Sequence, residues 1–442
     1  MKDSILGEYK LVLGLEIHLQ LNTEYKMFCG CKGNFWGLEP NTNTCPVCLG
    51  LPGALPVPNK EAVKNTQLMG LALHCELNKD SRFDRKHYFY PDLPKGYQIS
   101  QYKQPLCIEG YLDLESGNKA IIERVHLEED VAKSFHEKNR TLIDFNKSGV
   151  PLVEIVTDPC FTNVEDAVDY AKQIQSIARR LGISDVDMEK GQMRLEANIS
   201  LRTAEMLEKG QLPDYKVEVK NINSFKFMEK AIIAEIKRQR KVLEEGGTPI
   251  QENRGYDEVH DKTVPQRTKE EASDYRYFPE PDIPPLSFDE KYIQDLKNSL
   301  PELPYETKER LVKELGLAKD SAGLLVDNLG YEYVFKIEEI VEEGINAQDA
   351  ANELINNLQM RELDPAEFVK KYKESRETLE DENILAKAAE EVISENEEAV
   401  SDYLEGKEAS IQYLLGQMMK KTKGKADPQK SISILKEEIS QK

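Results

Sequence analysis

The chain has 442 residues, of which 39% are apolar, and its 59 basic and 80 acidic side chains give a formal net charge of −21. This length predicts two to four domains, and the acidity excludes a uniformly basic nucleic-acid coat, although not a local basic patch. No apolar run reaches the roughly 18 residues of a membrane helix, and the first residues lack a secretory signal. We therefore expect a cytosolic, multidomain protein with no membrane span.

Alternating strand patterns open the chain. In residues 11–21, Leu15, Ile17 and Leu19 fall on one face, while Glu16 and His18 fall on the other. The same alternation recurs at residues 193–202 and, more briefly, at residues 216–220, and helical patterns lie between the strands, as at residues 165–181 and 227–245. Strands mixed with helices in no regular rhythm predict an α+β fold with a largely antiparallel sheet.

Four prolines within residues 279–285 mark a domain seam, because such a segment cannot be helical. Beyond it, Lys/Glu-rich helical patterns dominate, and a second break lies near Pro365. We predict an α+β domain over residues 1–293, an all-α domain over residues 294–372 and a small α-helical tail over residues 373–442.

Four of the seven cysteines are paired at short spacing within residues 28–50: Cys29, Cys31, Cys45 and Cys48. A C-x-C pair and a C-x-x-C pair can present four thiolates tetrahedrally, which predicts a closed, structural zinc site. The alternative is four unrelated thiols, which rarely take such spacings. The isolated Cys75, Cys107 and Cys160 are expected to be small buried side chains.

Acidic side chains interrupt several apolar, strand-like segments; they are Glu16 (near His18), Glu128, Glu129, Glu154 and Glu196. Glu154 stands among Leu152, Val153, Ile155 and Val156, where an unpaired carboxylate is costly to bury. Converging carboxylates repel unless a cation lies between them, and an oxygen-rich set with one imidazole suits Mg²⁺. The alternative is that each acid is a solvated strand residue. The sequence contains no Walker loop, so metal and basic side chains would have to hold any nucleotide phosphates.

Two further segments are candidates for binding. One mixes basic and aromatic side chains, and the other is a short run of positive charge. Residues 82–101 interleave four bases with five aromatic rings, which indicates either a packed loop or a surface that stacks a base. Residues 420–425 form a basic island on an acidic protein. Such an island is either a solvated tail or a contact for an RNA backbone.

Long ordered motifs resemble the family of the B subunit of the aspartyl/glutamyl-tRNA(Asn/Gln) amidotransferase. Together with the four-cysteine loop they cover about the first 285 residues: 14–18, 84–92, 96–101, 126–130, 149–154, 196–200, 220–224 and 274–282. Residues 412–420 and 423–428 resemble the C-terminal tail of that family. One departure is the helical region over about residues 294–375, which is shorter than the usual one. The chain also lacks the large inserted domain of the archaeal Gln-only relative, which favours the three-subunit enzyme.

The resemblance implies an ATP- and Mg²⁺-dependent ligase. It would phosphorylate the side-chain carboxylate of mischarged Glu-tRNA(Gln) or Asp-tRNA(Asn), and ammonia that the amidase, or A, subunit releases from glutamine would then displace phosphate. A small C subunit would tie the two larger ones together. The implied fold is a catalytic cradle resembling glutamine synthetase, a helical domain and a helical tail that recognises tRNA.

By the same resemblance, the catalytic and magnesium-binding positions are Glu16, His18, Glu129, Glu154 and Glu196. Alternation places Glu128 with His126 on the face opposite Glu129, so either Glu128 or Glu129 points inward. We assign Glu128, Arg194 and Lys220 to cofactor binding. Of these, Arg194 and Lys220 are suggested for phosphate contacts, with structural ion pairing as the alternative. Two other functions stay open: a non-catalytic tRNA-binding scaffold of the same fold, and a free-standing ligase for a small substrate, which the tail disfavours.

Overall fold

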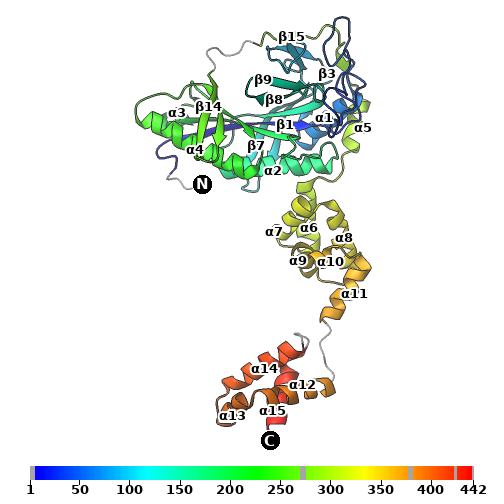
Figure 1. Ribbon diagram of the computed structural model, residues 1–442, viewed down its shortest axis with the longest axis vertical. Helices are drawn as coiled ribbons and strands as arrows, with labels where there is room; N and C mark the ends of the chain where they lie inside the picture. The colour runs from blue at the N-terminus through cyan, green and yellow to red at the C-terminus, as the bar shows by residue number, and fades with distance from the viewer. Residues whose placement is uncertain (1–4, 269–274, 377–381, 423–425, 441–442) are drawn as a thin grey trace. The chain divides into compact units, whose positions relative to one another are not determined.

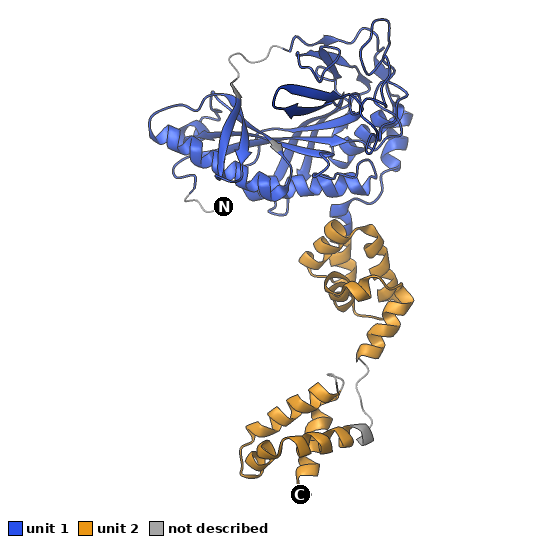
Figure 2. Ribbon diagram, in the orientation of Figure 1, with its two compact units in different colours: residues 1–307 blue, residues 308–442 orange. Residues whose placement is uncertain are grey.

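The computed structural model describes residues 5–268, 275–376, 382–422 and 426–440. The chain divides into two compact units, residues 1–307 and 308–442 (Figure 2). The predicted boundaries after residues 293 and 372 stay predictions; Leu296 and Leu303 pack in the core of the first unit. Among the described residues, none of the helices combines the length and the apolar character that crossing a membrane requires.

A nine-stranded sheet forms the centre of the first unit, and every neighbouring pair except β12 with β13 is antiparallel. This confirms the predicted α+β class with a largely antiparallel sheet. In spatial order the strands are β14 (Lys262–Thr268), β13 (Glu252–Asp257), β12 (Val217–Ile222), β11 (Met193–Arg202), β1 (Lys10–Gln20), β10 (Pro151–Thr157), β7 (Lys119–Glu129), β6 (Cys107–Asp113) and β2 (Glu76–Leu77).

Three small sheets accompany the large one. They pair β16 (Leu286–Ser287) with β3 (Asp80–Ser81), β8 (Lys133–Glu137) with β9 (Arg140–Asp144), and β4 (Asp84–His87) with both β5 (Tyr97–Ser100) and β15 (Phe278–Pro279). The pairing of β15 with β4 joins residues almost 200 positions apart. It therefore brings the two aromatic segments of the sequence side by side.

Helices pack against one face of the large sheet, and Figure 1 shows α2 and α4 on that side, with β8, β9 and β15 on the other. The helices of this unit are α1 (Lys60–Ala72), α2 (Val164–Arg180), α3 (Ala204–Glu208), α4 (Phe225–Glu244) and α5 (Glu290–Asn298). Asn163 and Ser224 cap α2 and α4, since their side chains accept from the backbone N–H groups of Asp166 and Phe227.

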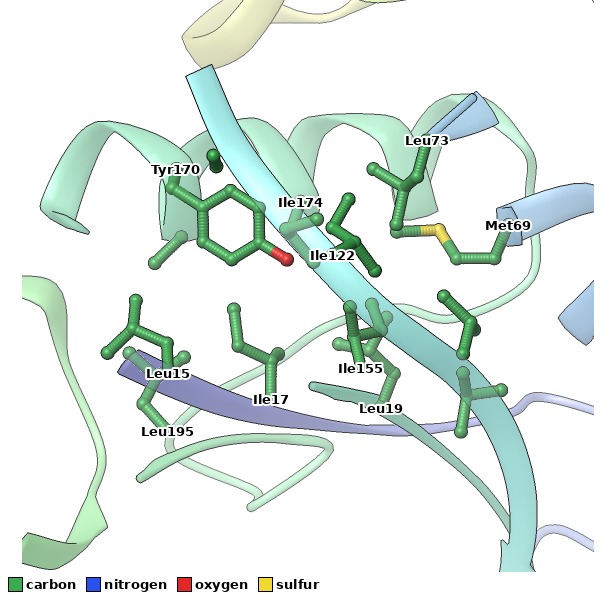
Figure 3. Packing of buried hydrophobic residues seen from close by; sticks show 14 of the residues in the cluster. Leu15, Ile17, Leu19, Met69, Leu73, Ile122, Ile155, Tyr170, Ile174 and Leu195 are labelled. Atoms are coloured by element: carbon green, nitrogen blue, oxygen red, sulfur yellow. The ribbon is translucent and has the colours of Figure 1, made fainter. Parts of the chain in front are cut away.

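The core lies between this helical layer and the sheet. Leu15, Ile17 and Leu19 of β1 are at most 1% exposed and face Tyr170 of α2 and its neighbours (Figure 3). Burying each such aliphatic side chain stabilises the fold by about 1.5–3 kcal/mol. Because the side-chain period of a strand is two, the intervening Glu16 and His18 are directed to the opposite face of the sheet.

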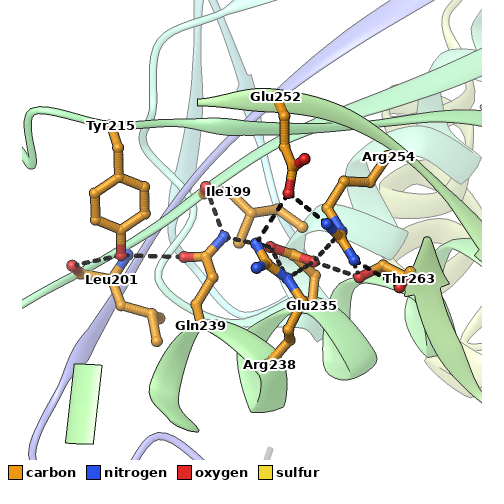
Figure 4. A network of polar contacts seen from close by, with 9 residues as sticks. All are labelled: Ile199, Leu201, Tyr215, Glu235, Arg238, Gln239, Glu252, Arg254 and Thr263. Carbon is orange, nitrogen blue, oxygen red and sulfur yellow. Dashed lines mark hydrogen bonds and ion pairs between the residues drawn. The ribbon is translucent and has the colours of Figure 1, made fainter. Parts of the chain in front are cut away.

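A buried polar network fixes the β13–β14 hairpin against α4 (Figure 4). Glu235 is fully buried and accepts hydrogen bonds from Gln239 Nε2 at 2.8 Å and Thr263 Oγ1 at 2.6 Å. Arg254 donates through Nε to the same Thr263 hydroxyl at 2.9 Å, and it also pairs with Glu252. Arg238 also pairs with Glu235, at 2.6 Å, so removing Glu235 would leave Arg238 and Arg254 to share the single carboxylate of Glu252. Breaking a buried ion pair in this way costs several kcal/mol.

The described part of the second unit is entirely helical, as predicted beyond the proline seam. One core spans Leu311 to Tyr372 and a separate one spans Leu385 to Ile439. The helices are α6 (Pro304–Leu315), α7 (Lys319–Gly323), the π-helix η1 (Leu324–Leu329), α8 (Tyr331–Glu342), α9 (Ala347–Asn356), α10 (Leu358–Arg361), α11 (Pro365–Arg376), α12 (Glu382–Glu395), α13 (Glu397–Leu404), α14 (Ala409–Lys421) and α15 (Pro428–Ser440).

Candidate functional site

The register of five neighbouring strands, β12, β11, β1, β10 and β7, builds a row of ionisable side chains across the face of the sheet that the helices leave open. Glu16 pairs with Glu196, His18 with Glu154, and Glu154 with His126. Residues directly opposite in antiparallel strands project to the same face. Side chains far apart in the sequence are thereby gathered into what we call the carboxylate row: Glu16, His18, His126, Glu128, Glu154, Glu196, Glu218 and Lys220.

One half of the row centres on Glu154. Its Oε2 lies 3.1 Å from His126 Nε2 and 3.6 Å from His18 Nε2, and His18 Nε2 is 3.7 Å from Glu128 Oε1. His18, Glu128 and Glu154 each offer a ligand atom within 4.8 Å of the others, so this group has the donor chemistry of a divalent cation site.

The other half consists of Glu16, Glu196 and Glu218, whose carboxylate oxygens also approach within 4.8 Å of one another. Asn198 Nδ2 donates to Glu16 Oε1 at 2.8 Å. Lys220 Nζ lies 2.8 Å from Glu196 and 3.1 Å from Glu218. A single ammonium therefore offsets part of the charge of three carboxylates.

Burial and neighbouring charges together divide four carboxylates of the row into two classes. Burial, followed by the charge of Glu154, raises the pKa values of Glu16 and Glu128. Burial would also raise the pKa of Glu154, but His126 and His18 hold it well below its ordinary range. In the same way, His18 and Lys220 outweigh burial and lower the pKa of Glu196. At Glu16 and Glu128, the cations of the described residues thus do not outweigh burial and repulsion.

Glu129, which we expected among the metal ligands, lies apart from the row. Its Oε1 accepts from Lys95 Nζ and, at 2.9 Å, from the backbone N–H of Ile99. Glu128 occupies the inward position instead, because β7 directs His126 and Glu128 to one face and Glu129 to the other. Strand alternation in the sequence already contained this signal.

Arg194 and Lys220, suggested for phosphate contacts, both lie in ion pairs. The Arg194 guanidinium is 3.3 Å from Asp130, and Lys147 Nζ is 2.8 Å from the same carboxylate. Although burial opposes ionisation, these two cations lower the pKa of Asp130 to about 2. Lys220 is paired with Glu196 and Glu218, so both cations form ion pairs in the folded chain, and their phosphate contacts stay a prediction.

Sequence reasoning missed Glu218, His126 and Lys86 as members of the site. Glu218 is on the polar side of the short alternating segment 216–220, and that pattern could have identified it. Lys86 on β4 lies 5.0 Å from the ring centre of Tyr275. Burial would lower the pKa of Lys86, but Glu128 and Glu154 raise it well above the ordinary value, so the ammonium of Lys86 interacts with these two acids of the row from the separate small sheet that contains β4.

The four cysteines of residues 28–50 converge as the spacing predicts. Their Sγ atoms lie within 4.8 Å of one another, and Cys45 Sγ is 3.9 Å from Cys48 Sγ. Tetrahedral zinc with Zn–S bonds of about 2.3 Å separates its sulfurs by roughly 3.8 Å, so the donor set fits zinc. The buried Lys26 supports the thiolate form, because its Nζ lies 3.8 Å from Cys48 Sγ.

Only the first residues of the basic island, 420–422, are among the described residues. Lys420 is exposed, and Lys421 pairs with Glu391 at 2.7 Å and Glu395 at 2.8 Å. Lys423 and Lys425 lie outside the described residues.

Comparison with known proteins defines the class of protein. Residues 11–294 match the model of the GatB/GatE catalytic domain, and residues 307–439 match the GatB domain. The carboxylate row thus falls within a catalytic domain of an amidotransferase, and the predicted enzyme class, one component of a transamidating ligase complex, is confirmed.

Several curated relatives carry one name, that of the B subunit of aspartyl/glutamyl-tRNA(Asn/Gln) amidotransferase. The protein from Thermoanaerobacter sp. (strain X514) is 40% identical over 480 residues, covering 98% of this chain and 100% of the relative. Those from Thermodesulfovibrio yellowstonii and Persephonella marina are 41% and 42% identical, covering 95% and 97% of this chain and 97% and 99% of theirs. The chain belongs to this B-subunit family of the aspartyl/glutamyl-tRNA(Asn/Gln) amidotransferase, as its motifs predicted.

Proposed function

We propose that the carboxylate row activates the side-chain carboxylate of Glu-tRNA(Gln) or Asp-tRNA(Asn) by phosphoryl transfer from ATP, and that ammonia then displaces the phosphate to leave the amide. The observation that carries this proposal is the convergence of two acid groups on one sheet face within the matched catalytic domain. A carboxylate is a poor electrophile because hydroxide leaves badly, whereas phosphate is a good leaving group.

The residues of the row fit magnesium. Five carboxylates and two imidazoles face one another, and burial together with the charge of Glu154 raises the pKa values of Glu16 and Glu128, so a bound cation would stabilise their ionised forms. His18 Nε2 lies 3.6 Å from Glu154 Oε2 and 3.7 Å from Glu128 Oε1, so this nitrogen is the imidazole atom that would ligate a cation between the two acids, while Nδ1 has no hydrogen-bond partner among the described residues. We assign His18, Glu128 and Glu154 to one cation site and Glu16, Glu196 and Glu218 to a second.

When bound, magnesium would neutralise phosphate charge and keep the attacking and leaving oxygens in line. The chain's own residues supply the rest. His126 orients Glu154 through a 3.1 Å contact, and Lys220 holds Glu196 and Glu218 together. Lys86 faces the row from β4, where the charges of Glu128 and Glu154 keep it protonated, so its ammonium can hold an anionic group beside them. Glu129, with Lys95, contributes to folding around the cysteine loop.

Several finer features belong to the same proposal. The open face of the antiparallel sheet would act as a cradle like that of glutamine synthetase, over residues 1–293, and the four cysteines would hold structural zinc. The domain of residues 294–372 and the tail of residues 373–442 would position tRNA. The A and C subunits of a heterotrimer would supply ammonia and join the complex, in the cytoplasm where aminoacyl-tRNA is made.

Reconstitution tests the proposed function. The chain is co-expressed with candidate A and C subunits, and the complex is assayed on Glu-tRNA(Gln) and Asp-tRNA(Asn) with ATP and glutamine. We expect tRNA-dependent formation of ADP and amide in equal amounts. A complex that binds tRNA but forms neither product would contradict the proposal and leave a tRNA-binding scaffold.

The role of the tail in tRNA binding is tested by a point substitution. Truncation before Lys420 would remove α15, whose Leu435 and Ile439 are buried in the core of this region, so it would disrupt folding. Lys420→Ala changes only an exposed cation. If Lys420 contacts a phosphate, the substitution weakens tRNA binding severalfold and reduces the slope of log K against log salt by about 1. An unchanged slope would contradict the contact.

A further inference from the structure

A groove of about 750 Å³ lies beside the carboxylate row, over β6, β7 and the turn that follows β5. Arg124 of β7 lines it, and Arg124 is two residues from His126 on the same strand, or about 7 Å by strand geometry. The groove is therefore adjacent to the acids. Its size is that of a small-molecule site, and none of its lining residues belongs to the row.

Two stacked tyrosine rings, Tyr102 and Tyr277, lie at this groove, and we call them the aromatic platform. Tyr102 lines the groove, is 50% exposed, and stacks on Tyr277 with ring centres 4.3 Å apart and planes at 10°. Because Tyr277 covers one face of Tyr102, the other face is the surface that a planar ligand would meet. Glu154 and Glu128 act electrostatically on Tyr277, so the stack connects the groove with the row.

The platform is held in place by the backbone. Oδ2 of Asp84, a residue only 1% exposed, accepts from the N–H groups of Tyr102 at 3.1 Å and Lys103 at 3.2 Å. A buried carboxylate that accepts two backbone bonds fixes the turn, so Tyr102 loses little freedom when a ligand stacks on it. Glu109, which also lines the groove, has a φ of +52°, a strained conformation that is common at ligand sites.

Charge in the groove favours a neutral, polar ligand over a polyphosphate. Three cations and three carboxylates line it: Lys103, Lys119, Arg124, Glu109, Glu123 and Asp158. Such a balanced lining can bind hydroxyl groups without attracting net charge. Arg124 pairs with Glu123 through Nη1, and its buried Nε has no hydrogen-bond partner among the described residues.

We propose that this groove is an adenosine subsite, in which Tyr102 stacks the purine and the polar wall binds the ribose. This proposal rests on the proposed function, which brings two adenosines to the row: that of ATP and the 3′-terminal adenosine of the aminoacyl-tRNA. Stacking of a base on an aromatic ring contributes about 1–3 kcal/mol by alanine substitution, or roughly 5- to 150-fold in affinity.

The experiment measures the KM for ATP, the KM for mischarged tRNA, and kcat in the assembled complex. The variants are Tyr102→Ala, Tyr102→Trp, which keeps a stacking surface, and the control Tyr25→Ala, whose ring has a similar exposure of 46% outside the groove. We expect Tyr102→Ala to raise one KM roughly tenfold or more, while Tyr102→Trp and Tyr25→Ala stay near wild type. A rise in the KM for ATP alone assigns the groove to the adenosine of ATP. A rise in the KM for tRNA alone assigns it to the terminal adenosine of the tRNA.

Three results would overturn the subsite: unchanged KM values for both substrates, a fall in kcat alone, or an equal rise in both KM values with the same change in Tyr25→Ala. Equilibrium binding of ATP and of tRNA to the wild-type and Tyr102→Ala complexes separates this outcome from failure of the proposed function. If the wild-type complex forms no amide, the proposed function fails, and a Tyr102-dependent loss of binding still supports the groove. If amide forms and neither affinity depends on Tyr102, only the groove fails.

Discussion

The cysteine loop and the carboxylate row are two candidate metal centres in one domain, and they are assembled in opposite ways. The four thiols come from residues 29–48, so two short turns determine their geometry. The row draws its ligands from residues 16–218 and exists only because five strands take a particular register. A slip of one residue in β10 would direct Glu154 into the core.

The two centres also differ in how their charge is compensated before any metal binds. Lys26 approaches a thiol at the loop, and the fourfold ligand set leaves no open position for a substrate. The row keeps carboxylates with raised pKa values and an imidazole nitrogen without a partner among the described residues. The loop is thus suited to stability and the row to chemistry, which separates the expected effects of their substitutions.

The largest effect is expected at Glu154. Glu154→Gln preserves volume but removes the charge between His18 and His126, so amide formation by the complex should fall by at least ~100-fold while folding is retained. The assay is tRNA-dependent amide formation, with circular dichroism to monitor the fold. Glu76→Gln, an exposed glutamate on the edge strand of the same sheet, is the matched control. Full turnover of Glu154→Gln would remove Glu154 from the site.

The adjacent Glu128 and Glu129 give the sharpest test of register. Glu128→Gln should abolish tRNA-dependent ADP formation, because Glu128 faces His18, whereas Glu129→Gln should retain it. Glu129→Gln should instead lower thermal stability, since it leaves Lys95 buried without its charge partner. ADP formation and the melting temperature are measured on the same preparations of each variant. The opposite pattern would show that β7 presents its other face to the row.

At the loop we expect a loss of stability with little direct loss of chemistry. Cys45→Ser should reduce bound zinc from about one per chain to near zero and lower the melting temperature, at about 2–4 °C for each kcal/mol lost. Elemental analysis and thermal unfolding measure the two effects. Cys160→Ser, which changes an isolated cysteine, should alter neither. Wild-type protein without zinc would refute the site.

The smallest effect is expected at Lys220. Lys220→Met removes the ammonium between Glu196 and Glu218, so the free energy of unfolding should fall by about 1–2 kcal/mol. Magnesium should bind more tightly, because the metal no longer competes with that charge. Denaturant unfolding and magnesium titration measure the two changes. Lys216→Met, at an exposed position just before the same strand, is the control. Unchanged magnesium binding would place Lys220 outside the electrostatics of the row, and weaker binding would contradict the expected competition between its charge and the metal.

These two centres mark what the sequence alone can predict. The spacing of the cysteines is local information, and so is the alternation in β1 and β11 that directs Glu16, His18 and Glu196 to one face. Which strands become neighbours is decided by packing across the whole sheet, so the pairing of Glu16 with Glu196 could not be derived from spacing. The position of Lys86 beside the row could not be predicted for the same reason, since Lys86 belongs to a separate small sheet.

The central claim is that the carboxylate row binds divalent metal, and crystals soaked in manganese test it most directly. Our account predicts an anomalous peak among His18, Glu128 and Glu154, with a second near Glu16, Glu196 and Glu218, and loss of the first peak in Glu154→Gln. Zinc at the four cysteines provides an internal standard. A strong zinc signal at the cysteines, with no manganese peak in the row after a soak in millimolar manganese, would contradict the claim.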